Sequence, residues 1–358
     1  MISYRKHKVL VAPLDWGLGH ATRCIPIIRG LLMNGHEVVL GAEKNQAALL
    51  RQEFPQLKMI PLAGYNVRYS RSGPFFALKL MTQLPRIYVA IRYEHRWLAK
   101  TIVAEKITCV ISDNRFGLYH ATVPCFFITH QLTIKAPFQW AERLLRSINY
   151  HFINRFKACW VPDRAEAPGI AGVLSHPPVM PAVPVFYINL LSRFVVATVP
   201  VKYDLCILLS GPEPQRSLLE EKILGQIGSV RASILLVRGR PADTGLPGVP
   251  AHVSIVNHMP GKQLGEAIQQ SELIVSRSGY TTVMELLALQ KKMILIPTPG
   301  QTEQEYLADL LLQAGLAIMI QQNSFELETA LAKAQQFAFK RQKVQLFDNE
   351  KITGLIEN

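Results

Sequence analysis

The chain has 358 residues, 49% of them hydrophobic, and 39 basic against 26 acidic residues give a net charge of +13. Its length predicts two domains rather than one core, no apolar run reaches the roughly 18 residues of a membrane-spanning helix, and the five scattered cysteines exclude a Cys-x-x-Cys zinc site and indicate a reducing cytoplasm. The positive charge favours an anionic partner, and the absence of zinc-finger, helix-turn-helix and RNA-recognition signatures argues against nucleic acid.

Short apolar runs rich in β-branched residues alternate with helical patterns along the whole chain. The basic start leads into a short apolar run and a glycine turn, which predicts a first strand rather than a signal peptide. The first half has a helix at about 21–34 and strands at 8–14, 37–43, 109–114, 124–130 and 158–163. The second half repeats this rhythm, with strands predicted at 203–210, 233–239, 253–259, 273–279, 293–299 and 316–321.

Nearly continuous apolar strands separated by helices predict an α/β fold with parallel sheets covered on both faces. The proline-rich stretch 175–200 lacks a helical pattern and indicates a boundary near 188–202. We therefore expect two Rossmann-like domains that face each other across a cleft, with ligands at the carboxyl ends of the strands. The expected parts are an N-terminal Rossmann-like domain at 1–190, a linker at 191–202, a C-terminal Rossmann-like domain at 203–340 and a tail at 341–358 that returns to the first domain.

The first strand is followed by "LDWGLGHATRC", a glycine turn with a histidine. Gly17 and Gly19 begin a dinucleotide fingerprint, but Thr22 stands where its third glycine belongs, which argues against a dehydrogenase. His20 lies at the start of the next helix and could take a proton from an acceptor hydroxyl, since a helix N-terminus disfavours its cationic form. The alternative is a histidine that only caps the helix.

Three further residues accompany this turn. Asp113 ends the strand at 109–114 and is a candidate to orient His20, although strand ends also carry Asp for capping. The pairing resembles the His–Asp pair of plant small-molecule glycosyltransferases. His130 ends the next strand and is a candidate for contact with the acceptor. Arg23 either belongs to the loop that binds a phosphate or the acceptor, or is a surface charge.

The strand at 273–279 leads into "SRSGYTTVMEL", the strongest local signal. Ser278 is predicted to cap the following helix and Gly279 to let a ligand approach the backbone, because the N–H groups at a helix start favour a diphosphate. At helical spacing Thr281, Thr282 and Glu285 lie on the same face as Ser278, and the carboxylate could bind two ribose hydroxyls. The alternative is a capped helix with a solvated glutamate.

Two more strand ends in the second half carry polar residues. "IPTPGQTEQEYLADLL" places Gln304 and Glu305 at a helix start, where they could bind sugar hydroxyls. "LLSGPEPQR" offers Ser210, Gly211 and Arg216, the last being either a diphosphate ligand or a surface arginine.

Together these motifs resemble the donor-binding region of family 28 glycosyltransferases, which include the N-acetylglucosaminyltransferase of peptidoglycan synthesis and the plant galactolipid synthases. The resemblance covers residues 204–320 and implies a GT-B fold, with Glu285 on the ribose of a UDP-sugar and Gln304 on the sugar. Glu305 stands where the peptidoglycan enzyme has a second glutamine. The chain has no Asp-x-Asp motif, so we expect no metal or other cofactor, and backbone N–H groups and arginines would stabilise the leaving group. We expect an inverting transfer, in which the acceptor hydroxyl displaces UDP in one step.

Two other functions compete with transfer to a hydroxyl acceptor. Gly17-x-Gly19-His20-x-x-Arg23-Cys24 also resembles the UDP-sugar hydrolases of nonulosonic acid synthesis, in which a histidine would activate water. The other alternative is a non-catalytic subunit that binds UDP-sugar. Residues 68–100 and 134–157 are expected on the acceptor side. The second segment mixes aromatic and basic residues. This composition is typical of a helix that rests on the anionic inner face of the plasma membrane, or of a helix that packs on its own domain.

Overall fold

The structure, a computed structural model, describes residues 6–65, 83–136 and 138–357, which divide into two compact units. Of these, residues 6–65, 83–136, 138–193 and 345–357 form unit 1, and residues 194–344 form unit 2. The boundary between 193 and 194 lies inside the predicted linker. Residues 68–82 and 137 of the two predicted acceptor-side segments, 68–100 and 134–157, lie outside the described residues.

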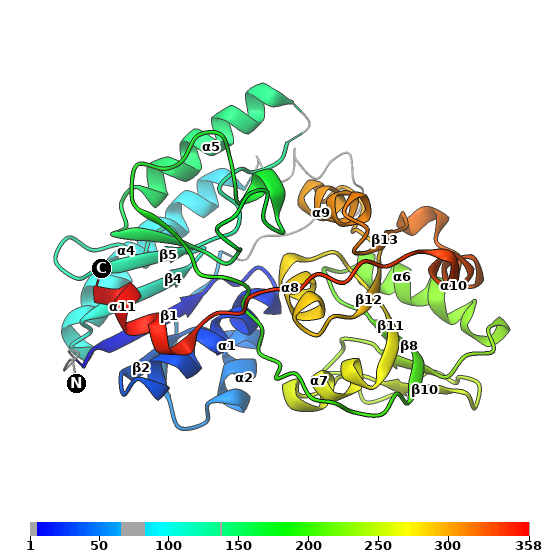
Figure 1. The fold of residues 1–358 in the computed structure, drawn as a ribbon. Helices are drawn as coiled ribbons and strands as arrows, with labels where there is room; N and C mark the ends of the chain where they lie inside the picture. Colours follow the sequence, from blue (N-terminus) through cyan, green and yellow to red (C-terminus); the bar gives the residue numbers. More distant parts are fainter. Residues whose placement is uncertain (1–5, 66–82, 137, 358) are drawn as a thin grey trace. The chain divides into compact units, whose positions relative to one another are not determined.

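Unit 1 is built on a seven-stranded parallel sheet in the order β3-β2-β1-β4-β5-β6-β7 (Figure 1). Its inner strands are almost completely buried, which explains their continuous apolar sequences. The strands are β1 (Lys8–Pro13), β2 (Glu37–Gly41), β3 (Lys58–Ile60), β4 (Cys109–Asp113), β5 (Cys125–Ile128), β6 (Ala158–Val161) and β7 (Val185–Tyr187). The helices are α1 (Leu18–Met33), α2 (Lys44–Glu53), α4 (Leu84–Glu105), α5 (Gln139–Ile153) and α11 (Ile352–Glu357).

Unit 2 has a six-stranded parallel sheet in the order β10-β9-β8-β11-β12-β13. Its strands are β8 (Tyr203–Leu208), β9 (Ile234–Val237), β10 (Val253–Val256), β11 (Ser271–Ser276), β12 (Lys292–Leu295) and β13 (Ile318–Met319). Its helices are α6 (Gln215–Leu224), α7 (Gly261–Gln269), α8 (Tyr280–Ala288), α9 (Thr302–Gln313) and α10 (Leu327–Gln336).

Both sheets are wound in the same way. The first strand of each unit lies inside its sheet, with the next strands of the chain on one side and the later strands on the other. The winding direction therefore reverses between β1 and β4 in unit 1 and between β8 and β11 in unit 2. Sheets of this kind bind ligands beside that point, at the carboxyl ends of the strands.

The predicted fold class is confirmed, because both sheets are parallel and alternate with helices. Two strands, β3 and β7, were not predicted from sequence. Each has only three residues and lies at a sheet edge, which is too short for the pattern that identifies the inner strands.

The C-terminal residues pack on unit 1 in spite of their distance along the chain. Leu190 and Leu346 form a parallel bridge, and Asn34 donates a 2.8 Å hydrogen bond to the carbonyl of Asn349. Helix α11 then packs against α1 (Figure 1). Its Thr353 hydroxyl lies 3.0 Å from Nε2 of the buried His36.

Candidate active site

The turn after β1 brings the start of α1 to the carboxyl end of the sheet. Gly17 has a φ of +93°, a conformation that side chains other than glycine rarely adopt, and its N–H donates a 2.9 Å bond to Asp15. Helix α1 begins at the next residue, so Gly19 lies in its first turn rather than in the loop. The strand register pairs Pro13 of β1 with Asp113 of β4, which places the helix start beside that carboxylate.

His20 and Asp113 are in direct contact at this strand edge. Nδ1 of His20 lies 3.0 Å from Oδ2 of Asp113, which is fully buried, while 15% of the His20 side chain is exposed. The contact proposed from the sequence is therefore present, whereas its catalytic role stays a prediction. Nε2 of His20 has no hydrogen-bond partner among the residues that the structure describes.

Arg23 is a buried member of the same cluster, so its interpretation as a surface charge was wrong. Its side chain is 2% exposed, and Nε donates bonds of 2.9 and 3.0 Å to the two Asp113 oxygens, while Nη2 also donates to Oδ1. Nη1 lies 3.2 Å from Nδ1 of His130. His130 is itself buried and joins the cluster through Arg23.

The surroundings set the charge of these groups. Burial lowers the pKa of His20, and the positive charge of Arg23 lowers it further, although the Asp113 carboxylate raises it. Burial alone would raise the pKa of Asp113, but Arg23 and then His20 outweigh that effect and hold it below its usual value. The cluster therefore combines an ionised carboxylate with an imidazole that is neutral at physiological pH.

A second buried cluster, which the sequence did not suggest, supports this strand end. The Glu94 carboxylate on α4 accepts a 2.7 Å bond from Arg115, a 2.8 Å bond from the Tyr65 hydroxyl and a 3.0 Å bond from the Gly117 N–H. Arg115 also donates a 2.7 Å bond to the carbonyl of Pro13, the last residue of β1. These contacts fix the ends of β1 and β4, and nothing in the local sequence indicates such a long-range pairing.

In unit 2 the turn after β11 differs from the prediction in its cap. Helix α8 begins at Tyr280 with Gly279 as N-cap, and Ser278 does not cap it. The Ser278 hydroxyl instead donates a 2.8 Å bond to the carbonyl of Gln304, which ties this turn to the start of α9. A Cβ on Gly279 would meet no atom within 4 Å, so the helix start is open to a ligand.

Helix α8 carries three of the predicted donor residues. Thr281 and Thr282 are half-buried, and Glu285, one turn further, is only 6% exposed. The alternative of a solvated glutamate was therefore wrong. The predicted common face holds for these three residues, whereas Ser278 precedes the helix.

Gln304 and Glu305 hold the loop that follows β12. Oε1 of Gln304 accepts a 2.9 Å bond from the N–H of Thr298, and Oε1 of Glu305 accepts a 3.0 Å bond from the N–H of Gly300. Gly300 has a φ of +80°, so the loop depends on a glycine there. Both predicted sugar ligands thus lie at the carboxyl edge of the sheet.

Arg216 is buried and paired, so it is not a surface arginine. Nε donates a 2.7 Å bond to Glu213 and Nη1 a 2.9 Å bond to Glu220, which also contacts Arg238. These two carboxylates already neutralise the charge proposed for a diphosphate. Ser210 and Gly211, in contrast, are exposed at the end of β8.

Arg277 is the residue that the sequence interpretation missed in this unit. It is 2% exposed and donates to the carbonyls of Ile296, Pro297 and Gln215 and to the Gln322 side chain, and burial lowers its pKa to about 10. It has no carboxylate partner among the described residues. An arginine directly after a buried apolar run was the available signal.

Arg277 and Thr298, which both lie close to Gly211, each carry a buried polar atom without a partner in the part of the chain that the structure describes. Nε of Arg277 and the hydroxyl of Thr298 are buried and have no hydrogen-bond partner among the described residues. A Cβ on Gly211, where φ is +101°, would lie 3.8 Å from that hydroxyl and 4.0 Å from Cγ of Arg277. The ends of β8, β11 and β12 therefore offer positive charge and donors at one place.

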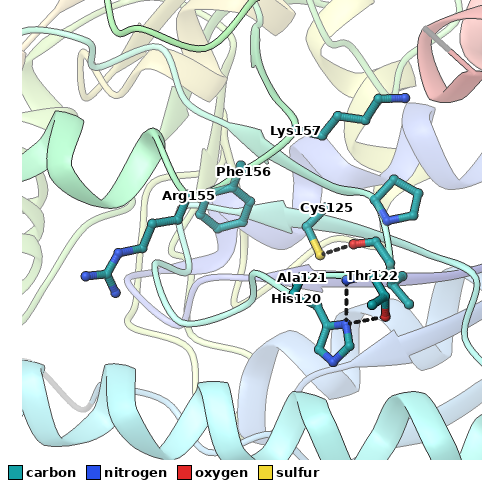
Figure 2. A pocket seen from close by; sticks show the side chains of 9 residues that line it. His120, Ala121, Thr122, Cys125, Arg155, Phe156 and Lys157 are labelled. Carbon is teal, nitrogen blue, oxygen red and sulfur yellow. Dashed lines mark hydrogen bonds between the residues drawn. The ribbon is translucent and has the colours of Figure 1, made fainter.

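A pocket of about 370 Å³ lies at the opposite end of the unit 1 sheet, before β5 and β6 (Figure 2). No predicted site residue lines it. In Figure 2 the side chains of Arg155, Lys157 and His120 point in different directions, so they do not converge on one ligand. Its lining residues are His120, Ala121, Thr122, Val123, Pro124, Cys125, Arg155, Phe156 and Lys157.

Among the described residues, no three or more His, Cys, Asp or Glu side chains are grouped to hold a metal ion. No helix within residues 6–65, 83–136 and 138–357 combines the length and apolar character needed to span a bilayer.

The chain is similar in sequence to known glycosyltransferases. Residues 252–353 match the model of the glycosyltransferase family 28 C-terminal domain. An uncharacterized glycosyltransferase of Methanosarcina acetivorans is 24% identical over 87% of this chain and 85% of its own length. A UDP-N-acetylglucosamine–N-acetylmuramyl-(pentapeptide) pyrophosphoryl-undecaprenol N-acetylglucosamine transferase of Rhodopseudomonas palustris is 42% identical over 21% of each chain.

Solved glycosyltransferase structures share the fold at low sequence identity. The glycosyltransferase of kitacinnamycin aligns with a TM-score of 0.66 and 16% identity, over 99% of this chain and 95% of that chain. The spinosyn rhamnosyltransferase SpnG, complexed with thymidine diphosphate, aligns with a TM-score of 0.65 and 15% identity, over 98% and 100% of the two chains. Residues 252–353 therefore resemble the glycosyltransferase family 28 C-terminal domain, and the chain is a glycosyltransferase with a GT-B fold.

Proposed function

We propose that this glycosyltransferase transfers a hexose or N-acetylhexosamine from a UDP-sugar to a hydroxyl acceptor, with inversion at the anomeric carbon and without a metal. The observation that carries the proposal is the His20 imidazole, held by the buried Asp113 while its Nε2 makes no bond within the described residues. A neutral imidazole with a free ring nitrogen is a suitable general base for a hydroxyl.

The chemical step is a single displacement. Nε2 of His20 takes the proton of the acceptor hydroxyl as the acceptor oxygen forms a bond to the anomeric carbon. The bond from that carbon to the diphosphate oxygen breaks, and UDP leaves with the electron pair. Because attack and departure occur on opposite sides of the carbon, the configuration inverts. Asp113 keeps the imidazole oriented throughout.

The donor is assigned to unit 2, on the set of residues at the ends of β8, β11 and β12. The open backbone at Gly279, the Thr298 hydroxyl and Arg277 suit the diphosphate, since fixed donors and positive charge stabilise a developing anion without a metal. Glu285 would bind the ribose, and Gln304 and Glu305 would bind the sugar after releasing the loop that they hold. The thymidine diphosphate bound to SpnG is consistent with a nucleoside diphosphate donor.

The acceptor is proposed to be lipid-linked, because α5 exposes an apolar stripe. Trp140, Leu144 and Ile148 follow one another at four-residue spacing and are 65%, 53% and 44% exposed, and Phe138 stacks on Trp140. Arg143 on the same helix is exposed, and the chain carries a net charge of +13. Such a surface suits an anionic bilayer, where apolar side chains insert and basic ones face headgroups.

Vesicle binding tests the α5 stripe. The protein should sediment with vesicles that contain phosphatidylglycerol and not with pure phosphatidylcholine. Leu144→Ala should weaken the binding, whereas Leu218→Ala, on α6 with a similar exposure of 46%, should not. Equal binding by both variants would contradict a role for this helix.

The proposed reaction is tested by product analysis. A thermal-shift screen of nucleotide sugars first identifies the donor, because a bound donor stabilises only the folded state. The donor is then incubated with candidate acceptors in EDTA, and the anomeric configuration of the product is determined by NMR. Release of UDP and free sugar at a catalytic rate without acceptor would instead indicate the hydrolase, and binding without turnover would indicate a non-catalytic subunit.

A further inference from the structure

The Arg23 guanidinium contacts every other polar group of the unit 1 cluster. It forms a forked ion pair with both Asp113 oxygens through Nε and Nη2. Its Nη1 lies 3.2 Å from Nδ1 of His130, and its Nη2 lies 2.9 Å from Nδ1 of His20. One buried side chain therefore connects α1, β4 and the loop that follows β5.

Two partners compete for one atom of His20. Oδ2 of Asp113 lies 3.0 Å from Nδ1, and Nη2 of Arg23 lies 2.9 Å from the same nitrogen. A carboxylate accepts and therefore favours a proton on Nδ1, whereas a guanidinium can only donate and favours a lone pair there. A proton on Nδ1 leaves the Nε2 lone pair free for an acceptor hydroxyl, and a lone pair on Nδ1 puts a hydrogen on Nε2.

Charge explains why both partners are useful. A carboxylate alone beside an imidazole favours a second proton on the ring, which would remove the base. The Arg23 charge lies against the same nitrogen and opposes that proton, while its fork keeps Asp113 ionised and fixed. The other titratable groups at this position are Cys24, whose Sγ lies 3.9 Å from Asp113, and His130.

We propose that Arg23 is a positioning residue of the active site: it fixes the Asp113 carboxylate against Nδ1 of His20 and opposes a second proton on that imidazole. The inference rests on the proposed function, in which His20 is the base. It extends that function because Arg23 would both orient the imidazole through Asp113 and keep the imidazole neutral. The lowered pKa of His20, to which burial contributes most and Arg23 next, supports it.

The first test replaces Arg23 by glutamine in the full chain. Histidine-labelled protein is titrated by NMR, and the His20 resonance, one of ten histidines, is assigned with His20→Gln. Arg23→Gln should raise the titration midpoint of His20, move the acid limb of kcat/KM to higher pH, and lower kcat at neutral pH. Arg29→Gln removes the same charge from the same helix, where the Arg29 side chain is 41% exposed and binds Glu53, and should leave the midpoint unchanged.

The second variant, Arg23→Lys, tests the positioning role of Arg23 even if Arg23→Gln does not fold. Lysine keeps the charge but not the fork, so it cannot hold Asp113 and reach His130 at once. The acid limb should stay in place while kcat falls about tenfold or more through misplacement of the dyad. The ¹⁵N shifts of His20 should show a changed balance of ring tautomers. A kcat equal to that of the parent would overturn the positioning role.

The outcomes separate this inference from the proposed function. An unchanged or lower His20 midpoint in folded Arg23→Gln would overturn the role of Arg23. A raised midpoint with an unmoved acid limb would support that role, and it would show that His20 is not the base. A raised midpoint with a raised acid limb supports both.

Discussion

The two units use the same strand order for opposite kinds of chemistry. In unit 1, His20 and Arg23 at the start of α1 meet Asp113 at the end of β4, and the charges of Arg23 and Asp113 neutralise each other inside a buried cluster. In unit 2 the corresponding ends carry Arg277, which has no carboxylate partner within the described residues, and an open helix start at Gly279. A cluster whose charges are paired, as in unit 1, can gain or lose one proton. A positive charge without a carboxylate partner, as in unit 2, attracts an anion.

This difference shows that the fold supplies only the position. Both sites lie where the winding of the sheet reverses, which parallel sheets offer to any ligand. The residues that follow each strand decide whether the position becomes an acid–base site or an anion site. The comparison predicts that variants in unit 1 change turnover and its pH dependence, whereas variants in unit 2 change donor binding.

His20→Ala should have the largest effect. Loss of a general base lowers kcat by roughly 10²–10⁴-fold, and the dissociation constant of the UDP-sugar, measured by calorimetry, should stay close to that of the parent. His120→Ala, at the other end of the same sheet, serves as the control for loss of a histidine. A His20→Ala enzyme with most of its turnover would break the assignment of acid–base chemistry to unit 1.

The pH profile sharpens the same assignment. Burial and Arg23 lower the pKa of His20 below its ordinary value of 6.5, so the neutral, base-competent form persists as pH falls through 6.5. We expect kcat/KM to be level from pH 8 to 6.5 and to decrease only at lower pH, toward tenfold per unit once the ring is protonated. An acid limb above 6.5 would contradict a base with a lowered pKa.

Sequence patterns were sufficient to predict the fold and some of the residues at each candidate site. Continuous apolar runs identified the inner strands, and a polar residue after each run identified Asp113 and His130, because strand ends of a parallel sheet share one edge. Burial of Arg23 and Arg216 was not predictable, since their partners, Asp113 and Glu220, are recognised only once the strands and helices are packed.

The cap of α8 shows a second reason for failure. Serine before a helix usually caps it, yet the Ser278 hydroxyl bonds to the carbonyl of Gln304 on another helix. A local pattern cannot reveal that a carbonyl 26 residues away competes for the same side chain. The buried cluster of Glu94, Arg115 and Tyr65 was missed for the same reason.

Glu285→Gln should act on the donor and not on the base. A hydrogen bond from a hydroxyl to a charged carboxylate contributes about 1.5–3 kcal/mol, so binding of the UDP-sugar should weaken roughly tenfold to a hundredfold. Calorimetry measures this, with Glu272→Gln in the same unit as a control, because the Glu272 side chain is 52% exposed and pairs with Lys292. If Glu285→Gln binds the UDP-sugar as tightly as the parent, the ribose does not bind to Glu285 on α8.

Gly279→Ala should have the smallest effect and is the most specific test of the open helix start. Gly279 has a φ of −66°, which alanine adopts readily, and a Cβ there would meet no atom within 4 Å. Thermal stability should therefore hardly change, whereas Gly17→Ala, at a φ of +93°, should cost about 1 kcal/mol of folding free energy. If a diphosphate lies on the backbone of Gly279, the added methyl group intrudes on it, and UDP should bind several-fold more weakly by calorimetry. Equal UDP affinity in Gly279→Ala and the parent would mean that the anion approaches unit 2 elsewhere, with the end of β8 near Gly211 as the next position to test.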